Sequence, residues 1–365
     1  MSNEVDIIED DLLALDKDIF IFLLKDHSRS HYFAKHNNGN PEDESKQENI
    51  HWMTHDYEER GKGYQYNDAI KSENISGTYE KSRILMPRVL KDKHAQTKRT
   101  RDMAEVFTPS WICNKQNNLI DEAWFGRKDV FNHENEDNTW TPTEGKIVFP
   151  DIEGKTWRDY VAEHVLEITC GEAPYLVSRY DTTTGEKLPL EMRIGLLDRK
   201  LRVVDENAKD DGEWWLFTQV AFGATYGYEW QGDSLLLARE ALLYTFVEHY
   251  RQRYNSENPE PRMLQMIAYI VSWNVFQMDG LKGVVPETCA NLHVRQVDLF
   301  GETEQVVVCQ GCKEGTLTHH NGIYCEIVEW STIQTGLAYQ NGKFAGDIRK
   351  KKTQRFIDLF PKKTK

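Results

Sequence analysis

The chain has 365 residues, of which 39% are hydrophobic and 28% charged, and its formal net charge is −14. This composition predicts a globular chain long enough for one large domain or two, without the roughly 18–20 apolar residues in a row that a membrane span requires. The net charge disfavours tight DNA binding by this chain alone, because phosphate neutralisation supplies most non-specific affinity. The acidic N-terminus lacks a signal pattern and the six cysteines are dispersed. We therefore expect a cytoplasmic protein with reduced cysteines and no membrane partner.

Two basic segments depart from this acidic balance. Lys81–Arg101 and Arg349–Lys365 each contain eight Lys or Arg residues against one Asp. Such runs form either a solvated surface or a contact with nucleic acid, and the sequence leaves both interpretations open.

The first hundred residues read as a mainly helical N-terminal extension. Apolar residues predict a helix over Leu12–Leu24, polar residues predict a loop over Asp26–Ile50, and Ile84–Leu90 reads as a short strand or extended segment. The predicted organisation has three parts, namely this extension (1–103), a core (104–288) and a small Cys/His-rich element with a basic tail (289–365).

The core begins with a turn and a helix. Thr108 precedes Pro109 and is therefore held in an extended conformation, and Ser110 is suited to cap a helix that runs to Asp121. Alternatively, Phe107-Thr108-Pro109 is an ordinary proline-started helix without a ligand.

The stretch Val165–Leu176, VLEITCGEAPYL, predicts a buried strand that ends in a tight turn and runs into a helix. Glu167 lies near the carboxyl end of the strand, and Gly171 after Cys170 permits the turn. Ligands of open α/β sheets bind at the carboxyl ends of the strands, so this turn is the first candidate ligand site. The alternative is a strand, turn and helix with a purely structural role.

The following segments predict a repeated alternation of helix and strand. Helices are expected at Trp157–His164, Gly195–Asp205, Trp214–Phe222, Asp233–Tyr254 and Arg262–Ile270, with one strand ending at Glu229 and another, Val271–Leu281, carrying Asp279. A carboxylate at the end of the second strand can accept both ribose hydroxyls of a nucleotide-type cofactor, which is the role expected for Glu229. A surface glutamate is the alternative.

These segments resemble motifs X, I, II and III of S-adenosylmethionine-dependent DNA amino-methyltransferases, in the same order. The stretches ILMPRVLKDK, EAWFGRKDVFN, RIGLLDRKLRVV and GYEWQGDSLLLARE are similar to M subunits of type II restriction–modification systems that methylate adenine N6. The resemblance implies a Rossmann-like, doubly wound sheet, complete or incomplete. It also implies that S-adenosylmethionine is held by Phe107, Thr108, Pro109, Glu167, Cys170, Gly171, Glu229 and Asp279. In this chain Ala173 stands where the family has a second glycine.

The family's catalytic motif, Asn/Asp/Ser-Pro-Pro-aromatic, is absent from the sequence, which contains no Pro-Pro pair. No catalytic residue is therefore assigned. The chain is expected to be the cofactor-binding half of a split enzyme that methylates DNA only with a second polypeptide, which supplies the motif and target recognition and completes the sheet edge beyond Asp279. The alternatives are a non-catalytic, cofactor-binding scaffold and an inactive truncated remnant.

A Cys/His cluster follows the core. Cys309 and Cys312 form a CxxC pair, and His319, His320 and Cys325 come after it. Three cysteines and one of the two histidines would make a tetrahedral zinc site, with Cys289 and His293 as reserve ligands. The alternative is a hairpin whose reduced cysteines lie together without a metal.

Overall fold

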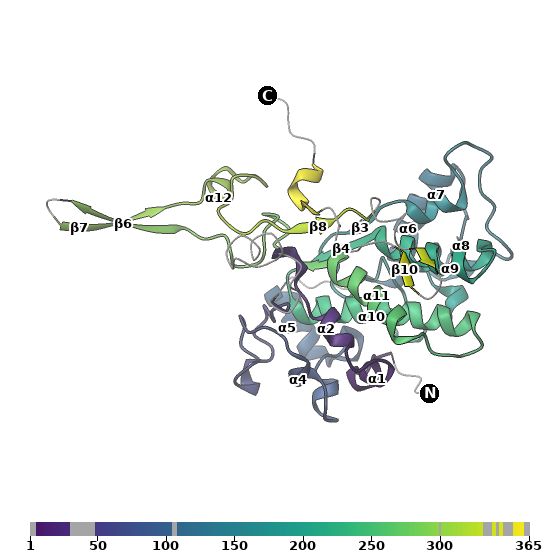
Figure 1. The fold of residues 1–365 in the computed structure, drawn as a ribbon, viewed down its shortest axis with the longest axis horizontal. Coiled ribbons are helices and arrows are strands. Elements are labelled where there is room, and N and C mark those ends of the chain that lie inside the picture. The colour runs from purple at the N-terminus through teal and green to yellow at the C-terminus, as the bar shows by residue number, and fades with distance from the viewer. Residues whose placement is uncertain are drawn as a thin grey trace.

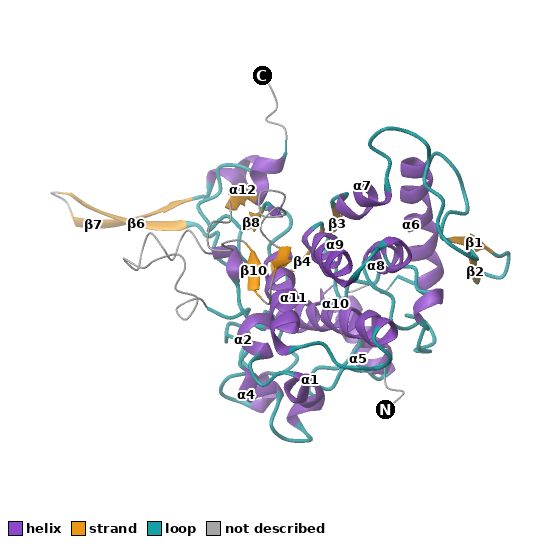
Figure 2. Cartoon of the chain, turned by 45° about the vertical axis from the view of Figure 1, so that its right-hand side comes forward, coloured by secondary structure: helices purple, strands orange, loops and turns teal. Residues whose placement is uncertain are grey.

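The computed structural model describes residues 5–29, 48–103, 108–298, 301–330, 338–340, 343–345 and 353–360. It is a mixed α/β structure in which helices surround small sheets, and one long hairpin extends away from the body (Figures 1 and 2). None of the helices in these ranges combines the length and apolarity needed to cross a lipid bilayer.

The helices and strands that matter below have the following bounds. The helices are α1 (Glu9–Leu15), α2 (Ile19–Leu23), α4 (Ser72–Ile75), α5 (Lys93–Met103), α6 (Ser110–Phe125), α7 (Trp157–Ala162), α8 (Leu196–Asn207), α9 (Asp211–Gly223), α10 (Gly232–Arg253), α11 (Pro261–Asn274) and α12 (Gln310–Glu314). The strands are β1 (Asn132–Glu134), β2 (Trp140–Pro142), β3 (Val165–Glu167), β4 (Thr225–Glu229), β5 (Val275–Gln277), β6 (Leu292–Asp298), β7 (Gly301–Val307), β8 (Glu326–Val328), β9 (Ala338–Gln340), β10 (Lys343–Ala345) and β11 (Thr353–Arg355).

A three-stranded parallel sheet lies at the centre, in the order β3-β4-β5. Val165 pairs with Thr225, and Gly227 pairs with Val275, so all three carboxyl ends point to one edge. Helices α8 and α9 connect β3 to β4, and α10 and α11 connect β4 to β5. Parallel neighbours require such crossovers, and the alternation of helix and strand predicted from the sequence is confirmed here.

The N-terminal segment contributes to the same hydrophobic core as the helices around the sheet. Leu12, Ile19 and Trp52 are almost completely buried in one cluster with apolar residues of α10 and α11. Helix α2 lies directly against α11. Residues before position 104 therefore stabilise the sheet rather than forming a separate core.

The predicted cap of α6 was wrong, because Pro109 occupies the N-cap position and Ser110 is the first helical residue.

Three further local predictions were wrong. Within 84–90, residues 88–90 form a 3₁₀ turn in place of a strand, and Pro87 before them disfavours strand pairing. The chain after Gly171 continues as turns until α8, since Ala173 has a left-handed φ of +62° and Pro174 follows it. Strand β5 has only three residues, because α11 continues to Asn274 and its end is buried.

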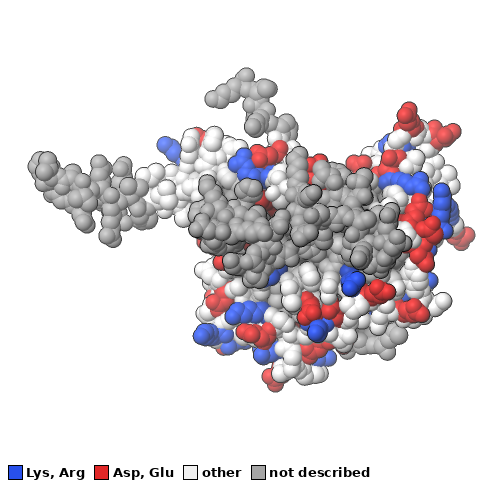
Figure 3. Space-filling model, viewed as in Figure 1, with Lys and Arg blue, Asp and Glu red and all other residues white. Residues whose placement is uncertain are grey.

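Part of the first basic segment is structural. The buried Arg99 guanidinium donates to Asp233 at 2.8 Å and to Gln231 at 2.6 Å, and it also pairs with Asp56 at 2.8 Å. Burial alone would raise the pKa of Asp233, but Arg99 outweighs it and lowers that pKa to about 2. On the face drawn in Figure 3, Lys and Arg side chains lie intermixed with Asp and Glu.

Two other buried carboxyl groups, on α1 and α10, are protonated rather than ionised. Glu9 on α1 and Glu240 on α10 are both fully buried, and their carboxyl oxygens have no hydrogen-bond partner among the described residues. Burial and the neighbouring Glu240 raise the pKa of Glu9 to about 11, and burial raises that of Glu240 well above its usual range. Both groups are therefore protonated at neutral pH.

We predict that Glu240→Gln stabilises the protein at alkaline pH. The raised pKa of Glu240 in the folded state contributes stability that is complete below pH 4.5, the unfolded value, and is lost progressively as pH rises towards the folded value. Glutamine stays neutral, so the variant should be more stable than wild type by about 1–3 kcal/mol at pH 8.5, with a smaller difference at pH 5. Urea unfolding at both pH values measures this, with the exposed Glu257→Gln as the control. If the difference in unfolding free energy between Glu240→Gln and wild type did not change with pH, Glu240 would not have a raised pKa.

Candidate functional site

A hollow of about 1050 Å³ lies at the carboxyl ends of β3 and β4. Its lining comes from the turn after β3, from the residues after β4 and from α6. The residues that line it include Thr108, Asn117, Glu167, Cys170, Gly171, Tyr175, Glu229, Trp230, Gln231 and Ser234. Its size and its position at parallel strand ends are typical of a site for a small-molecule ligand.

Glu167 offers the hollow an unused hydrogen-bond acceptor. Its Oε1 accepts from the N–H of Tyr175 at 3.3 Å. Its Oε2 is buried and has no hydrogen-bond partner among the described residues. Burial raises the pKa of Glu167 well above its usual range, and the nearby Glu229 adds to the effect. Such a carboxyl group is stabilised by a ligand that donates a hydrogen bond or carries positive charge.

The turn after β3 has an unusual backbone. Thr169, Gly171 and Ala173 have φ values of +46°, +54° and +62°. This left-handed region is unfavourable for residues with a Cβ, above all for the β-branched Thr169. Strained residues of this kind concentrate at ligand sites, where the surrounding structure holds them in place. Ala173 is fully buried, so the position of the family's second glycine carries a methyl group here.

Glu229, at the end of β4, is hydrogen-bonded to the turn after β3. Its Oε2 accepts from the N–H of Gly171 at 2.9 Å, and its Oε1 accepts from the N–H of Trp230 at 2.8 Å. Burial raises the pKa of Glu229, although these backbone N–H groups lower it in part. Oε1 also accepts from the N–H of Gln231 at 3.3 Å, whereas Oε2 can accept a second hydrogen bond. Glu229 can therefore hold a ligand hydroxyl at Oε2 while keeping its backbone contacts.

Helix α6 closes another side of the hollow and is fixed by buried polar contacts. Asn117, which is fully buried, donates from Nδ2 to the carbonyl oxygens of Tyr175 and Ile194, both at 3.0 Å. Asp121 on the same helix forms a buried ion pair with Arg199 of α8. These contacts hold α6 against the turn after β3.

The structure brings together most of the residues predicted for cofactor binding. Thr108, Glu167, Cys170, Gly171 and Glu229 line the hollow, Pro109 directly precedes α6, and Phe107 lies outside the described residues.

Asp279 is placed elsewhere. It does not line the hollow, since β5 ends at Gln277 and the chain then turns back. Its carboxylate accepts from the N–H of Leu281 at 3.0 Å and pairs with Lys282 at 3.0 Å.

Sequence reasoning missed several lining residues. Trp230 and Gln231 directly follow Glu229, so their position after the second strand was an available signal. Asn117 and Ser234 lie inside helices that had been predicted, but a helical pattern does not show which polar residue faces a ligand.

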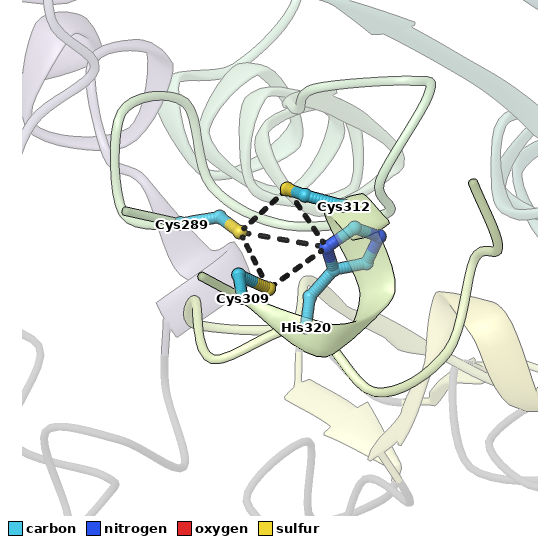
Figure 4. A group of neighbouring side chains, drawn as sticks. All are labelled: Cys289, Cys309, Cys312 and His320. Carbon is cyan, nitrogen blue, oxygen red and sulfur yellow. Dashed lines mark hydrogen bonds between the residues drawn. The ribbon is translucent and has the colours of Figure 1, made fainter. Parts of the chain in front are cut away.

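A second group of ligand-type side chains lies at the base of the hairpin. The Sγ atoms of Cys289, Cys309 and Cys312 and the Nδ1 of His320 lie within 4.8 Å of one another (Figure 4). Cys289 Sγ is 3.5 Å from Cys309 Sγ and 3.6 Å from Cys312 Sγ. His320 Nδ1 is 3.4 Å from Cys289 Sγ and 3.6 Å from each of the other two sulfurs. This group could hold a metal ion.

The residues around this group keep the His320 ring oriented towards the three sulfurs. His320 donates from Nε2 to the carbonyl oxygen of Thr316 at 2.7 Å, which leaves Nδ1 as the lone-pair nitrogen that faces the sulfurs. Gly311, between the two cysteines of the CxxC pair, has no room for a side chain. A Cβ there would lie 2.7 Å from His320 Nδ1 and 2.6 Å from the Thr318 carbonyl oxygen.

The ligand set differs from the predicted one at a single position, and of the two histidines that the sequence left open it contains His320. Cys325 is fully buried elsewhere, where its Sγ donates to the carbonyl oxygen of Gln277 at 3.6 Å. His319 faces Glu314, with 3.3 Å between Nδ1 and Oε2. Cys289, held in reserve from the sequence, takes the fourth position. The side chain of His293, the other reserve ligand, lies outside the described residues.

Comparison of the chain with family models, with curated proteins and with solved structures finds no match. Evidence on function therefore comes from the geometry of the hollow and of the cysteine and histidine group.

We predict that Gly171→Ala destabilises the protein by about 1 kcal/mol, whereas Gly171→Asn costs less. A Cβ at position 171 meets no atom within 4 Å, so the cost comes from the left-handed backbone alone, which asparagine tolerates better than alanine. Urea unfolding of the two variants measures the difference. Equal stabilities for alanine and asparagine would show that this turn is not held in the left-handed conformation.

Proposed function

We propose that this chain is the S-adenosylmethionine-binding part of a DNA adenine-N6 methyltransferase of a restriction–modification system. The observation that carries the proposal is the convergence of Glu167, Gly171 and Glu229 around one hollow at the ends of adjacent parallel strands. Their positions agree with the roles expected from the resemblance to motifs I and II. On this proposal β3, β4 and β5 are the first three strands of a Rossmann-like, doubly wound sheet.

The residues that line the hollow suit the parts of this cofactor. Glu229 Oε2 would accept a hydrogen bond from a ribose hydroxyl, and the unused Oε2 of Glu167 would accept from the α-ammonium group. Trp230 would offer an aromatic surface to the adenine. When bound, the cofactor supplies an electrophilic methyl group, and the residues of this chain orient it and shield it from water.

Methyl transfer would then depend on a second polypeptide. An adenine amino group becomes nucleophilic when acceptors beside the methyl group hold its two hydrogens, and the Pro-Pro-aromatic motif that positions them is missing from this sequence. With a net charge of −14, the chain would also rely on its partner for most of the DNA contact. Isolated, it is expected to bind the cofactor without methylating DNA. A cofactor-binding scaffold is the alternative function.

We also propose that the cysteine and histidine group binds one structural zinc ion. With Zn–S near 2.3 Å and Zn–N near 2.0 Å, a tetrahedral site places its sulfurs about 3.8 Å apart and sulfur and nitrogen about 3.6 Å apart. The observed separations of 3.4–3.6 Å lie close to these values. Four protein ligands leave no open position, as in structural sites.

We predict that Glu229→Ala weakens S-adenosylmethionine binding by roughly 10-fold to 100-fold, because the loss of a hydrogen bond to a charged group costs about 1.5–3 kcal/mol. Calorimetric titration of the isolated chain measures the affinity. The exposed Glu257→Ala, beyond the far end of α10, serves as the control. Melting curves of both variants exclude unfolding as the cause. Unchanged affinity in Glu229→Ala, or no binding by wild type, would refute the cofactor assignment.

We predict that Cys289→Ser removes bound zinc, whereas Cys325→Ser retains it. The two variants make the same chemical change, but only Cys289 lies in the metal-binding group. Metal analysis after purification without added zinc should give about one equivalent for wild type and Cys325→Ser, and less than about 0.2 for Cys289→Ser. Loss of zinc in Cys325→Ser alone would instead support the ligand set predicted from the sequence.

A further inference from the structure

The two outer strands of the parallel sheet differ in how they are covered. In β5, Val275, Phe276 and Gln277 are at most 1% exposed. The 3₁₀ turn η1 (His27–Arg29) lies against β5, and Cys325 Sγ donates to the Gln277 carbonyl oxygen. This edge, beyond which a partner was expected from the sequence, is already occupied by the chain itself.

Strand β3 forms the opposite edge, which is open as far as the described part of the chain shows. Among the described residues, β4 is the one strand that pairs with it. Val165 donates its N–H to Ala224, on the β4 side. Since backbone groups alternate sides along a strand, Leu166 directs its N–H and carbonyl to the open side. Leu166 is 42% exposed, and Ile168, which directly follows the strand, is 64% exposed. Parallel sheets are normally covered on both faces, and the unpaired N–H and carbonyl groups of an exposed apolar edge are a template for pairing with another strand.

An apolar groove runs beside this edge. Its volume is about 270 Å³, and it is lined by His164, Val165, Leu166, Tyr226, Phe276, Ile327, Val328, Glu329, Gln354, Phe356 and Leu359. Leu359, which lines the groove, is 49% exposed. Alternate side chains of a strand added to β3 would point into this groove, because successive side chains leave a strand on opposite faces.

The strand order defines the direction of the missing strand. Read from the covered edge to the open edge, the order is β5-β4-β3, which corresponds to strands 3, 2 and 1 of a doubly wound sheet. In such sheets the fourth strand pairs with the first, and the ligand lies at the carboxyl ends where the order reverses. The hollow with Glu167 and Glu229 lies at this end of β3.

We propose that the open edge of β3 binds a parallel strand of a second polypeptide, and that this strand ends in the Pro-Pro-aromatic motif beside the hollow. The inference rests on the proposed function, since it names where the catalytic partner joins. Apolar residues of the incoming strand fill the groove, and its backbone pairs with Leu166. Its carboxyl end delivers the motif to the bound cofactor, which completes the site that this chain holds in part.

The test uses a photo-reactive amino acid at two positions of the full-length chain in its native cells. His164 lies in the groove at the start of β3, whereas Leu281, which is 87% exposed, follows β5. The expected crosslink joins position 164 to a polypeptide segment that directly precedes a Pro-Pro-aromatic motif, with no such product from position 281. A crosslink to a second copy of this chain, the same partner at both positions, or no crosslink at position 164 would overturn the proposal.

A substitution provides the second measurement. Leu359→Lys places a charge in the groove but does not touch the hollow, so it should weaken the purified complex at least about tenfold while cofactor binding stays unchanged. Leu281→Lys is the matched control. An unchanged complex in Leu359→Lys would overturn the docking site. A specific complex formed by a chain that does not bind S-adenosylmethionine would refute the proposed function and leave the docking site standing.

Discussion

The parallel pairing of β4 with its two neighbours is the constraint on which the rest of the structure depends. It brings the ends of β3 and β4 to one edge, so that the Gly171 N–H reaches the Glu229 carboxylate at 2.9 Å. In a different register the carboxyl groups of Glu167 and Glu229 would not face the same hollow. The helices between the strands bury the sheet, and the N-terminal residues around Trp52 add to the same core.

The predictions from the sequence succeeded where the signal was local. The alternation of helices and strands, Gly171 in a turn and Glu229 at a strand end all follow from patterns within about ten residues. The choice between Cys325 and the reserve ligand Cys289 depends on long-range pairing and could not be made in this way. Cys289 reaches Cys309 only because Leu292 pairs with Val307 across the hairpin, whereas Cys325 is nearer to the CxxC pair in the chain but is buried against β5.

Buried charge is handled in two ways in this molecule. Asp233 remains ionised because Arg99 compensates its burial, which fixes α5 to the start of α10. Among the residues that the structure describes, neither Glu167 nor Glu229 forms an ion pair of this kind, and burial raises the pKa of both. The first arrangement stabilises the fold, whereas the second keeps hydrogen-bonding capacity available at the hollow.

The β6–β7 hairpin is long enough to act as a lever. Its strands of seven residues, at about 3.4 Å per residue, form an arm roughly 24 Å long. A rotation of about 10° at the base of such a lever displaces its tip by about 4 Å. Cys289 precedes one strand and Cys309 follows the other, so the base of the lever lies between two members of a single compact cluster. The three sulfurs and one nitrogen of the cluster therefore lie where a small local rotation is amplified along the arm.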